Sequence, residues 1–189
     1  MISNVSCIIP AFNEGARIER VLKAVCGHPA VFEILVVDDG STDTTAEVVG
    51  KYPEAHLLSY GENRGKSYAV SHGVSKAQGE IILFLDADLE GITADDVTSL
   101  LAPVLKGDAD MSISLRKNSL LIHKIIGLDF ISGERAFKRE IIAPYLDAIT
   151  ALPRFGLEVF LNDCALEEGW RLAVVRLHTV SSPRKSEKN

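Results

Sequence analysis

Short apolar runs and helical repeats alternate along the chain and predict strands followed by helices. Residues 5–10 form an uninterrupted apolar run that predicts a buried strand. Within residues 15–26, apolar side chains recur every three to four positions, which predicts a helix. The pattern then continues through strand 32–37, helix 44–49, strand 56–59, helix 65–77, strand 81–85, helix 93–106 and strand 109–115. Strands that alternate with helices predict βαβ crossovers and a mainly parallel sheet, in a three-layer α/β/α arrangement of the α/β class.

Two local signals refine the helix ends. Thr44 and Glu47 have the spacing of a capping box, and Gly79 is expected to stop the preceding helix.

The pattern changes after Leu115. Residues 116–128 mix basic and apolar side chains, which predicts an amphipathic helix over the site, on a membrane surface, or packed on the sheet. A polar turn at 131–137 is then expected to lead into helix 139–149, helix 155–168 and strand 171–177. We predict one domain over residues 1–180 and a polar, disordered tail at 181–189.

Composition narrows the classes of function. With 189 residues, 47% of them hydrophobic, the chain is long enough for one domain with a full core. The net charge of -6 argues against a nucleic-acid partner, because such binding relies on a basic surface. The three widely spaced cysteines predict buried thiols in a reducing cytoplasm. The N-terminus has no signal-peptide pattern and no apolar run reaches about 18 residues, so we predict a cytoplasmic protein.

The most informative stretch is the predicted strand 81–85 with the acids that follow it. If the chain stays extended, Asp86 and Asp88 leave the same face of the strand. Two carboxylates about 4 Å apart repel by roughly 4 kcal/mol at an effective dielectric near 20, and a divalent cation would offset that cost. Oxygen ligands suit Mg²⁺ or Mn²⁺. The alternative is that Asp88 caps the next turn while Asp86 faces solvent.

Three polar clusters follow predicted strands, at residues 10–14, 38–43 and 86–88. In parallel sheets ligands bind beyond the carboxyl ends of the strands, where these clusters are expected to meet. Each cluster taken alone is also ordinary turn chemistry.

The segment from Gly61 to Ser67 resembles a phosphate-binding P-loop with one residue missing. Three residues separate Gly61 from Gly65, whereas the P-loop needs four, so an NTPase is disfavoured. Lys66 at a helix start is still suited to a diphosphate, beside the positive end of the helix dipole. Its alternative role is that of a solvated helix lysine.

The order and spacing of four segments resemble family 2 glycosyltransferases of the GT-A fold. The segments are Pro10-Ala-Phe-Asn-Glu14, Val36-Val-Asp-Asp-Gly-Ser-Thr-Asp43, Asn63-Arg-Gly-Lys66 and Phe84-Leu-Asp-Ala-Asp88. The resemblance implies a nucleotide-diphosphate-sugar donor and a Mg²⁺ or Mn²⁺ ion at Asp86 and Asp88. It implies that the donor lies against Pro10, Ala11, Asn13, Glu14, Asp39, Gly65, Lys66, Asp86 and Ala87.

The second half resembles polyprenyl-phosphate sugar transferases and glucosyl-3-phosphoglycerate synthases, in Ser132-Gly-Glu-Arg-Ala-Phe-Lys-Arg-Glu140 and Phe155-Gly-Leu-Glu-Val-Phe160. In both branches this region faces the acceptor. The resemblance therefore implies acceptor contacts at Gly133, Arg135 and Arg154, catalytic roles for Glu158, Asp129 and Asp88, and a third metal ligand at His178.

Each of these roles has an ordinary alternative. Glu158 would instead form a salt bridge on the helix surface, Arg135 would pair with Glu134 or Glu140, and His178 would be buried without a ligand.

We therefore predict a metal-dependent hexosyltransferase that uses a UDP- or GDP-linked sugar and a phosphate-bearing acceptor, such as polyprenyl phosphate or a phosphorylated small molecule. A peripheral membrane contact and a homodimer fit this prediction. The alternatives from other classes are a nucleotidyltransferase or NTPase at the same sheet edge, and a domain that binds nucleotide-sugar without catalysis.

Overall fold

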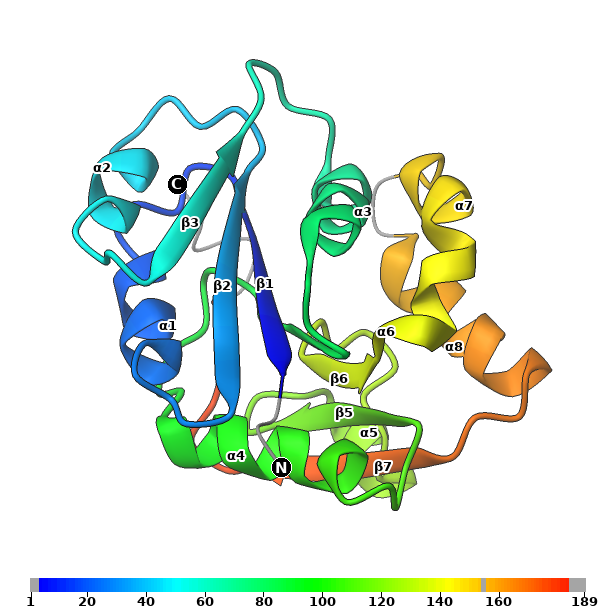
Figure 1. Cartoon of the computed structure of the whole chain (residues 1–189). Helices are drawn as coiled ribbons and strands as arrows, with labels where there is room; N and C mark the ends of the chain where they lie inside the picture. The colour runs from blue at the N-terminus through cyan, green and yellow to red at the C-terminus, as the bar shows by residue number, and fades with distance from the viewer. Residues whose placement is uncertain (1–3, 154–155, 184–189) are drawn as a thin grey trace.

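One seven-stranded sheet organises the computed structural model, which describes residues 4–153 and 156–183 (Figure 1). The strand order is β3-β2-β1-β4-β6-β5-β7. The strands are β1 (Val5–Ala11), β2 (Val31–Asp38), β3 (Ala55–Ser59), β4 (Ile81–Phe84), β5 (Met111–Arg116), β6 (Arg135–Lys138) and β7 (Leu172–Leu177). The helices are α1 (Ile18–Val25), α2 (Thr45–Val49), α3 (Lys66–Lys76), α4 (Ala94–Leu105), α5 (Leu121–Ile126), α6 (Arg139–Ile142), η1 (Ala143–Tyr145), α7 (Leu146–Thr150) and α8 (Leu157–Glu167).

The sheet is mainly parallel, as predicted, and β6 is the exception. It runs antiparallel between β4 and β5, while the other strand pairs are parallel. The predicted polar turn at 131–137 is confirmed over 131–134 and wrong over 135–137, where the chain forms β6. Glu134 and Arg135 lie within this predicted turn, yet both side chains are fully buried and hydrogen-bonded.

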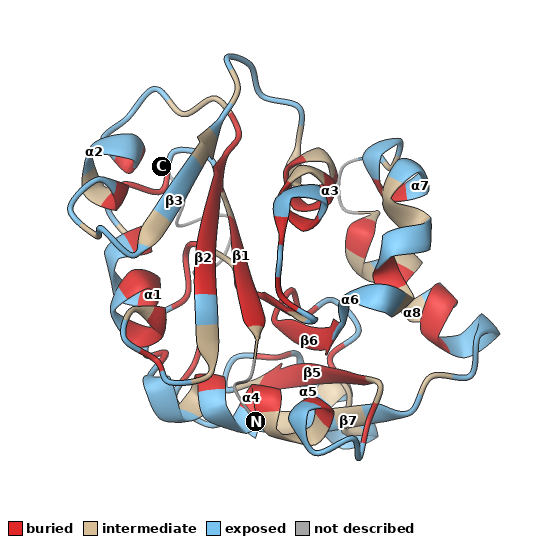
Figure 2. Cartoon of the chain, in the orientation of Figure 1, coloured by how far each residue is buried: buried red, intermediate tan, exposed pale blue. Residues whose placement is uncertain are grey.

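Helices cover both faces of the sheet, which confirms the three-layer α/β/α prediction. One apolar cluster packs α1, α2 and α4 against one face, with Ile18, Val49 and Leu101 among its buried residues. A second cluster packs α3, α6, α7 and α8 against the other face, through residues such as Val70 and Leu161. Figure 2 shows β1 and most of β2 as buried between these layers.

Several predicted boundaries differ from the structure. The expected helix at 139–149 is divided into α6, η1 and α7, because Pro144 lacks the N–H that a continuous helix requires. The predicted capping box at Thr44 does not form, and the Asp43 carboxylate instead accepts from the Thr45 amide at 2.9 Å. Gly79 is not a helix stop. It lies against β1, where its amide donates to the Ser6 hydroxyl at 2.8 Å.

The first two residues of the predicted tail, Ser181 and Ser182, contact the rest of the protein. Ser181 pairs with Glu90 in an antiparallel bridge, and Ser182 accepts a hydrogen bond from Arg116. Residues 184–189 lie outside the described part of the chain. No helix within the described residues has the length and apolar character needed to cross a bilayer. All three cysteines are free thiols, with Cys7 and Cys164 buried and Cys26 half-buried.

Candidate active site

The loops after β1 and β2 are joined by hydrogen bonds at the carboxyl edge of the sheet. The Asn13 amide donates to the Ser41 hydroxyl, and the Thr42 amide donates to the Asn13 side chain, both at 2.9 Å. The Glu14 amide also donates to the Thr45 hydroxyl at 2.9 Å. Asn13 has a φ of 55°, a left-handed conformation that asparagine tolerates better than most residues. Two of the three predicted polar clusters are therefore one connected surface, with Pro10 and Ala11 at the end of β1 beneath it.

Asp39 connects this surface to the loop that precedes α3. Its buried carboxylate accepts from the Arg64 and Gly65 amides at 2.7 and 2.8 Å, and from the Tyr60 hydroxyl at 3.0 Å. Burial and this hydrogen bond raise the pKa of Tyr60 well above its ordinary value. Gly65 has a φ of 92°, so the tight approach to α3 favours glycine there. These contacts orient the first turn of α3, where Lys66 lies.

Lys66 is the centre of the site. Its ammonium donates to Asp86 at 2.5 Å and to Glu158 at 2.7 Å. Burial alone lowers the pKa of Lys66, but the two carboxylates outweigh that effect and raise it above its ordinary value. The lysine is therefore a permanent cation rather than a solvated helix residue. Glu158 does form a salt bridge, but inside the site rather than on the helix surface.

Gly133 lies against this ion pair. A Cβ at residue 133 would lie 2.6 Å from an Asp86 carboxylate oxygen and 2.8 Å from the Lys66 ammonium. The loop before β6 therefore approaches the cluster as closely as it does only because residue 133 has no side chain.

The two acids of the Asp-x-Asp pair do not continue a strand. β4 ends at Phe84, and Ala87 and Asp88 lie in a turn, because the chain bends away from the sheet there. Asp86 reaches Lys66, whereas the buried Asp88 lies in the field of two arginines, Arg17 and Arg116. The expectation of an extended chain that projects both carboxylates from one face is therefore wrong.

These carboxylates suit a hard divalent cation. No three His, Cys, Asp or Glu side chains within residues 4–153 and 156–183 are grouped to hold a metal by themselves. A Mg²⁺ or Mn²⁺ ion here would take Asp88 or Asp86 as oxygen ligands and complete its coordination with phosphate oxygens and water, as Mg²⁺ does with nucleotides. The donor set therefore fits a metal that arrives with its nucleotide.

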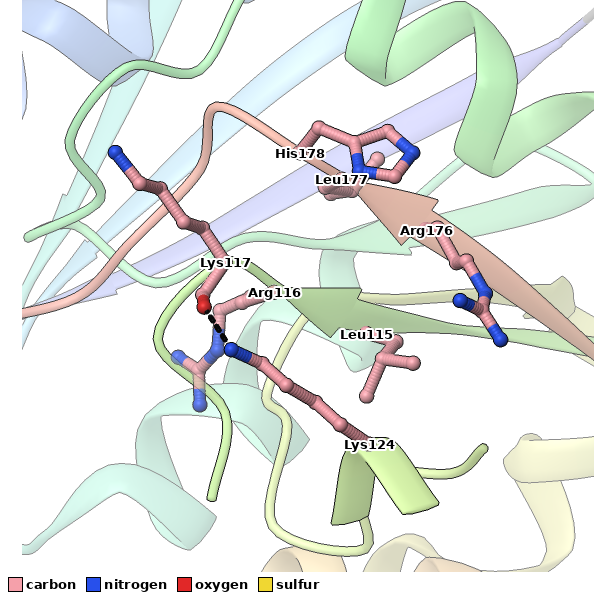
Figure 3. A pocket seen from close by; sticks show the side chains of 7 residues that line it. All are labelled: Leu115, Arg116, Lys117, Lys124, Arg176, Leu177 and His178. Carbon is pink, nitrogen blue, oxygen red and sulfur yellow. Dashed lines mark hydrogen bonds between the residues drawn. The ribbon is translucent and has the colours of Figure 1, made fainter. Parts of the chain in front are cut away.

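His178 is exposed rather than buried, and it lies at the edge where β7 ends (Figure 3). The segment that follows it returns to the loop after β4, because Ser181 pairs with Glu90. His178 also lines a cavity of about 300 Å³ whose other walls are Leu115, Arg116, Lys117, Lys124, Arg176 and Leu177. Four of the seven residues that line this cavity are lysine or arginine, in a chain whose net charge is -6.

Arg135 is enclosed in the protein. Its guanidinium donates to the Ser132 and Phe130 carbonyls and to the Asn162 side chain, and it reaches the Glu158 carbonyl at 3.4 Å. Burial lowers the pKa of Arg135 to about 10. It pairs with neither Glu134 nor Glu140. Its nitrogens donate within the protein, and its acceptor contact stays a prediction. Arg154 lies outside the described residues.

Asp129 and Glu134 form a buried polar layer beneath the cavity. Asp129 accepts from the Ser119 hydroxyl and lies 2.9 Å from His123 Nδ1. Glu134 accepts from the hydroxyls of Ser114 and Ser132 at 2.6 Å. Both carboxylates attract Arg116 and help raise its pKa against the opposing effect of its burial. Such contacts suit Asp129 to holding Arg116 at the end of β5 and the loop that follows it in place.

The sequence interpretation missed Arg116 and Arg17 as site residues. Arg116 is the last residue of β5, so it occupies the same kind of strand-end position as Asp38 on β2. This position at the carboxyl end of a strand was the sequence signal that could have identified Arg116 as a site residue. Arg17 pairs with the buried Glu14 at 2.9 Å, and only the folded loop brings it near Asp88.

Comparison with known proteins identifies the family. The family model described as "Glycosyl transferase family 2" matches residues 6–120, which is more than half of the chain. The chain belongs to this family. The match contains all three polar clusters of the site together with Lys66 and Arg116. It gives no support to the NTPase alternative.

Curated relatives within the family act on polyprenyl phosphates, according to their names. The chain is 31% identical over 133 residues to the dodecaprenyl-phosphate galacturonate synthase of Rhizobium johnstonii, a match that covers 64% of this chain and 39% of that protein. It is 39% identical over 98 residues to the undecaprenyl-phosphate 4-deoxy-4-formamido-L-arabinose transferase of Pectobacterium carotovorum, covering 47% and 30% of the two chains. The chain therefore spans well under half the length of these relatives.

A solved structure similar to this chain is a glucosyl-3-phosphoglycerate synthase from Mycobacterium tuberculosis in complex with Mn²⁺, UDP and glucosyl-3-phosphoglycerate. The TM-score is 0.81 at 25% identity, and the match covers 97% of this chain and 73% of that one. The predicted GT-A fold is confirmed. Both predicted branches of the family are thus represented among the relatives.

Proposed function

We propose that this family 2 chain transfers a hexose from a UDP- or GDP-linked sugar to a phosphate-bearing acceptor, with Mg²⁺ or Mn²⁺ as cofactor. The observation that carries the proposal is the contact of Lys66 with Asp86 and Glu158, together with the electrostatic attraction between the same Asp86 and Arg116, which lines the basic cavity. This arrangement puts a cation for a leaving diphosphate next to a surface for a second anion. Family membership and the Mn²⁺ and UDP in the similar solved structure support the same proposal.

The donor is expected to lie on the loops after β1 and β2. Pro10, Ala11, Asn13, Glu14 and Asp39 line this part of the sheet edge in our proposal, with Gly65, Lys66, Asp86 and Ala87 toward the diphosphate. The hydrogen bonds of Asn13 and Asp39 to neighbouring loops support it, because they hold this surface in one shape before a ligand arrives.

The transfer step places negative charge on the departing nucleoside diphosphate. A divalent cation held by Asp88, with Asp86 and His178 as further candidate ligands, would neutralise that charge as a Lewis acid. Lys66 provides a fixed positive charge at the same place, and such preorganised charge is most effective where water is excluded.

The acceptor is expected to bind in the cavity lined by Arg116, Lys124 and Arg176. Arg116 donates within the protein, to Ser182 at 2.9 Å and to Glu134 at 3.4 Å, so the exposed Arg176 is the guanidinium that we expect to bind a phosphate by paired hydrogen bonds. A phosphate acceptor would attack through its own anionic oxygen and need no base. A hydroxyl acceptor would need one, and Glu158 is the candidate base because Lys66 holds it within the site. Gly133 is expected to lie beside the acceptor, because its loop closely approaches Asp86 and Lys66. Asp129 acts in this proposal by holding Arg116 in place at the end of β5.

Calorimetric titration of UDP, GDP, UDP-glucose and GDP-mannose, with and without Mn²⁺, tests the donor site. We expect one nucleotide family to bind in a manganese-dependent manner, and Asp88→Ala to weaken this binding at least about tenfold, as loss of a metal ligand would. Asp163→Ala, which removes an exposed carboxylate from α8, is the matched control and should bind like the wild type. If none of the four ligands binds, the donor assignment fails.

Transfer of labelled sugar to a polyprenyl phosphate or to 3-phosphoglycerate tests the acceptor. Transfer to one of them would separate the two branches of the family. Donor binding without turnover on any phosphate-bearing acceptor would favour a domain that binds nucleotide-sugar without catalysis.

The proposal also includes the cellular location and the oligomeric state of the chain. We infer a cytoplasmic chain that meets its acceptor at the membrane surface when that acceptor is lipid-linked. A homodimer remains a prediction, which sedimentation of the purified chain would test directly.

A further inference from the structure

Helix α5 directs its apolar side toward solvent, whereas an ordinary amphipathic surface helix directs it toward the core. At about 100° per residue, Leu121, Ile125, Ile122 and Ile126 occupy one continuous sector of about 140°. Such a sector normally faces the core, but here none of the α5 residues is buried. Leu121 and Ile125 are 74% and 73% exposed.

The polar side of α5 faces the protein instead. His123 lies inward, with its Nδ1 2.9 Å from the buried Asp129 and its ring edge-to-face with Phe130. Lys124 donates to the Lys117 carbonyl and so ties the helix back to the end of β5. The helix is therefore held in place by its polar residues, and its apolar residues are directed outward.

The chain on either side of α5 extends this apolar surface. Three more large apolar side chains are exposed there. With them, the surface comprises Leu120, Leu121, Ile122, Ile125, Ile126, Phe130 and Ile131, which we call the α5 apolar face. Contiguous apolar surface of this kind marks an interaction site in a folded protein.

Basic residues flank the α5 apolar face. Lys117, Lys124 and Arg176 are exposed, and they line the cavity beside α5 together with His178 (Figure 3). The chain as a whole carries a net charge of -6, so this flank differs in sign from the molecule. Apolar side chains bordered by lysine and arginine are the composition of segments that lie in the interface of an anionic bilayer.

We propose that the α5 apolar face docks on the surface of an anionic lipid bilayer, with its basic flank against the headgroups. The proposal goes beyond the transfer reaction, because it holds for a soluble acceptor as well as for a lipid-linked one. Docking there would turn the basic cavity toward the bilayer surface.

Charge favours a lipid surface over a second copy of this chain. A twofold symmetric dimer through the α5 apolar face would bring the same patch of both copies together, so the basic flanks of both copies would border one interface. An anionic bilayer supplies both an apolar layer for the leucine and isoleucine side chains and the opposite charge for the lysines.

Vesicle flotation of the purified chain tests the proposal, with phosphatidylcholine vesicles that contain or lack phosphatidylglycerol. We expect the wild type to float with the anionic vesicles and to be released by salt, because screening weakens the attraction of the lysines. Leu121→Glu should reduce the bound fraction about tenfold, because it puts a charge in the apolar sector. Leu166→Glu makes the same change at an 82% exposed leucine of α8, and should bind like the wild type.

Thermal unfolding of both variants distinguishes lost docking from misfolding, since each replaced side chain is exposed and neither should change the melting temperature. The proposal is overturned if the wild type stays unbound with both kinds of vesicle, or if Leu121→Glu and Leu166→Glu float equally. It is also overturned if sedimentation shows a dimer that Leu121→Glu dissociates while neither form binds vesicles, which would assign the face to a second copy of the chain.

Discussion

The ammonium of Lys66 lies 2.7 Å from a carboxylate oxygen of Glu158, although the two residues are 92 positions apart. Lys66 begins α3, and Glu158 lies in the first turn of α8. The same ammonium holds Asp86 after β4. One cation therefore connects the proposed donor loops with the half of the chain where we propose that the acceptor binds.

Replacing Lys66 tests whether this cation serves the diphosphate. Lys66→Met keeps the length of the side chain but removes its charge, and we expect the affinity for nucleoside diphosphate to fall about 10- to 100-fold, the size of a lost charged hydrogen bond. Calorimetric titration of UDP or GDP in the presence of Mn²⁺ measures the change. Lys76→Met, on the exposed last turn of the same helix, is the control. Unchanged affinity in Lys66→Met would remove Lys66 from the donor site.

A methyl group at residue 133 should disturb the site without unfolding the protein. In Gly133→Ala the new Cβ would press on the ends of the Asp86 and Lys66 side chains, which are flexible and can shift. We expect kcat/KM for sugar transfer to fall at least about tenfold, because displacement of catalytic groups by a fraction of an ångström is costly. Gly61→Ala is the matched control, since no atom lies within 4 Å of a Cβ there. Equal activity of the two variants would mean that the Lys66 cluster tolerates displacement.

Arg135 should matter for stability rather than for acceptor affinity. Arg135→Ala removes the guanidinium that donates to the Ser132 carbonyl and to the Asn162 side-chain oxygen, and we expect the free energy of unfolding to fall by about 3 kcal/mol. Urea titration measures this loss. Arg176→Ala removes an exposed arginine of the basic cavity, and should leave stability unchanged while it raises KM for a phosphate-bearing acceptor. If Arg135→Ala is as stable as the wild type and has a raised KM for the acceptor, Arg135 binds the acceptor, as the sequence predicts.

Acid should remove a stabilising contact at the other end of β5. Arg171 donates to both Asp110 carboxylate oxygens, at 3.0 and 2.8 Å, and its side-chain hydrogen bond lowers the pKa of Asp110 from 3.8 to about 2. A carboxyl whose pKa is lowered by folding stabilises the native state at any pH above its pKa in the unfolded chain. This stabilisation is lost as the pH falls through the pKa of the carboxyl in the folded protein. Between pH 3.8 and about 2 the wild type should therefore lose more stability than Asp110→Asn. Urea unfolding at several pH values in this window measures the difference, and parallel curves would contradict the assignment.

The order of the elements and the location of the site followed from local pattern. Residues 5–10 and 32–37 predicted β1 and β2, because buried parallel strands are continuous apolar runs. The polar residues after these strands identified the carboxyl edge of the sheet, since parallel strands end together. Lys66 and Asp86 were both predicted, and in the structure they are in contact.

The second half could not be read in the same way, because its pairing depends on residues distant in sequence. The sequence of β6 predicts a polar turn. The burial of Glu134 and Arg135 depends on their contacts with Ser114 and Asn162, and these contacts form only when β6 inserts between β4 and β5. Arg135 is buried because its guanidinium donates hydrogen bonds to Ser132, Asn162 and Phe130. The outward orientation of α5 likewise depends on the buried position of Asp129, which holds His123 inward.

The sequence by itself thus determined the strand–helix alternation, the family and the residue types at the sheet edge, because these depend on short-range periodicity and on spacing along the chain. The tertiary structure decided which polar residues are buried, that Lys66 joins Asp86 to Glu158, and which side of α5 faces outward. Burying a polar or charged side chain costs free energy unless a hydrogen-bond or ion-pair partner offsets it. The partners of these side chains come from other strands and helices, which become neighbours only after the sheet has formed.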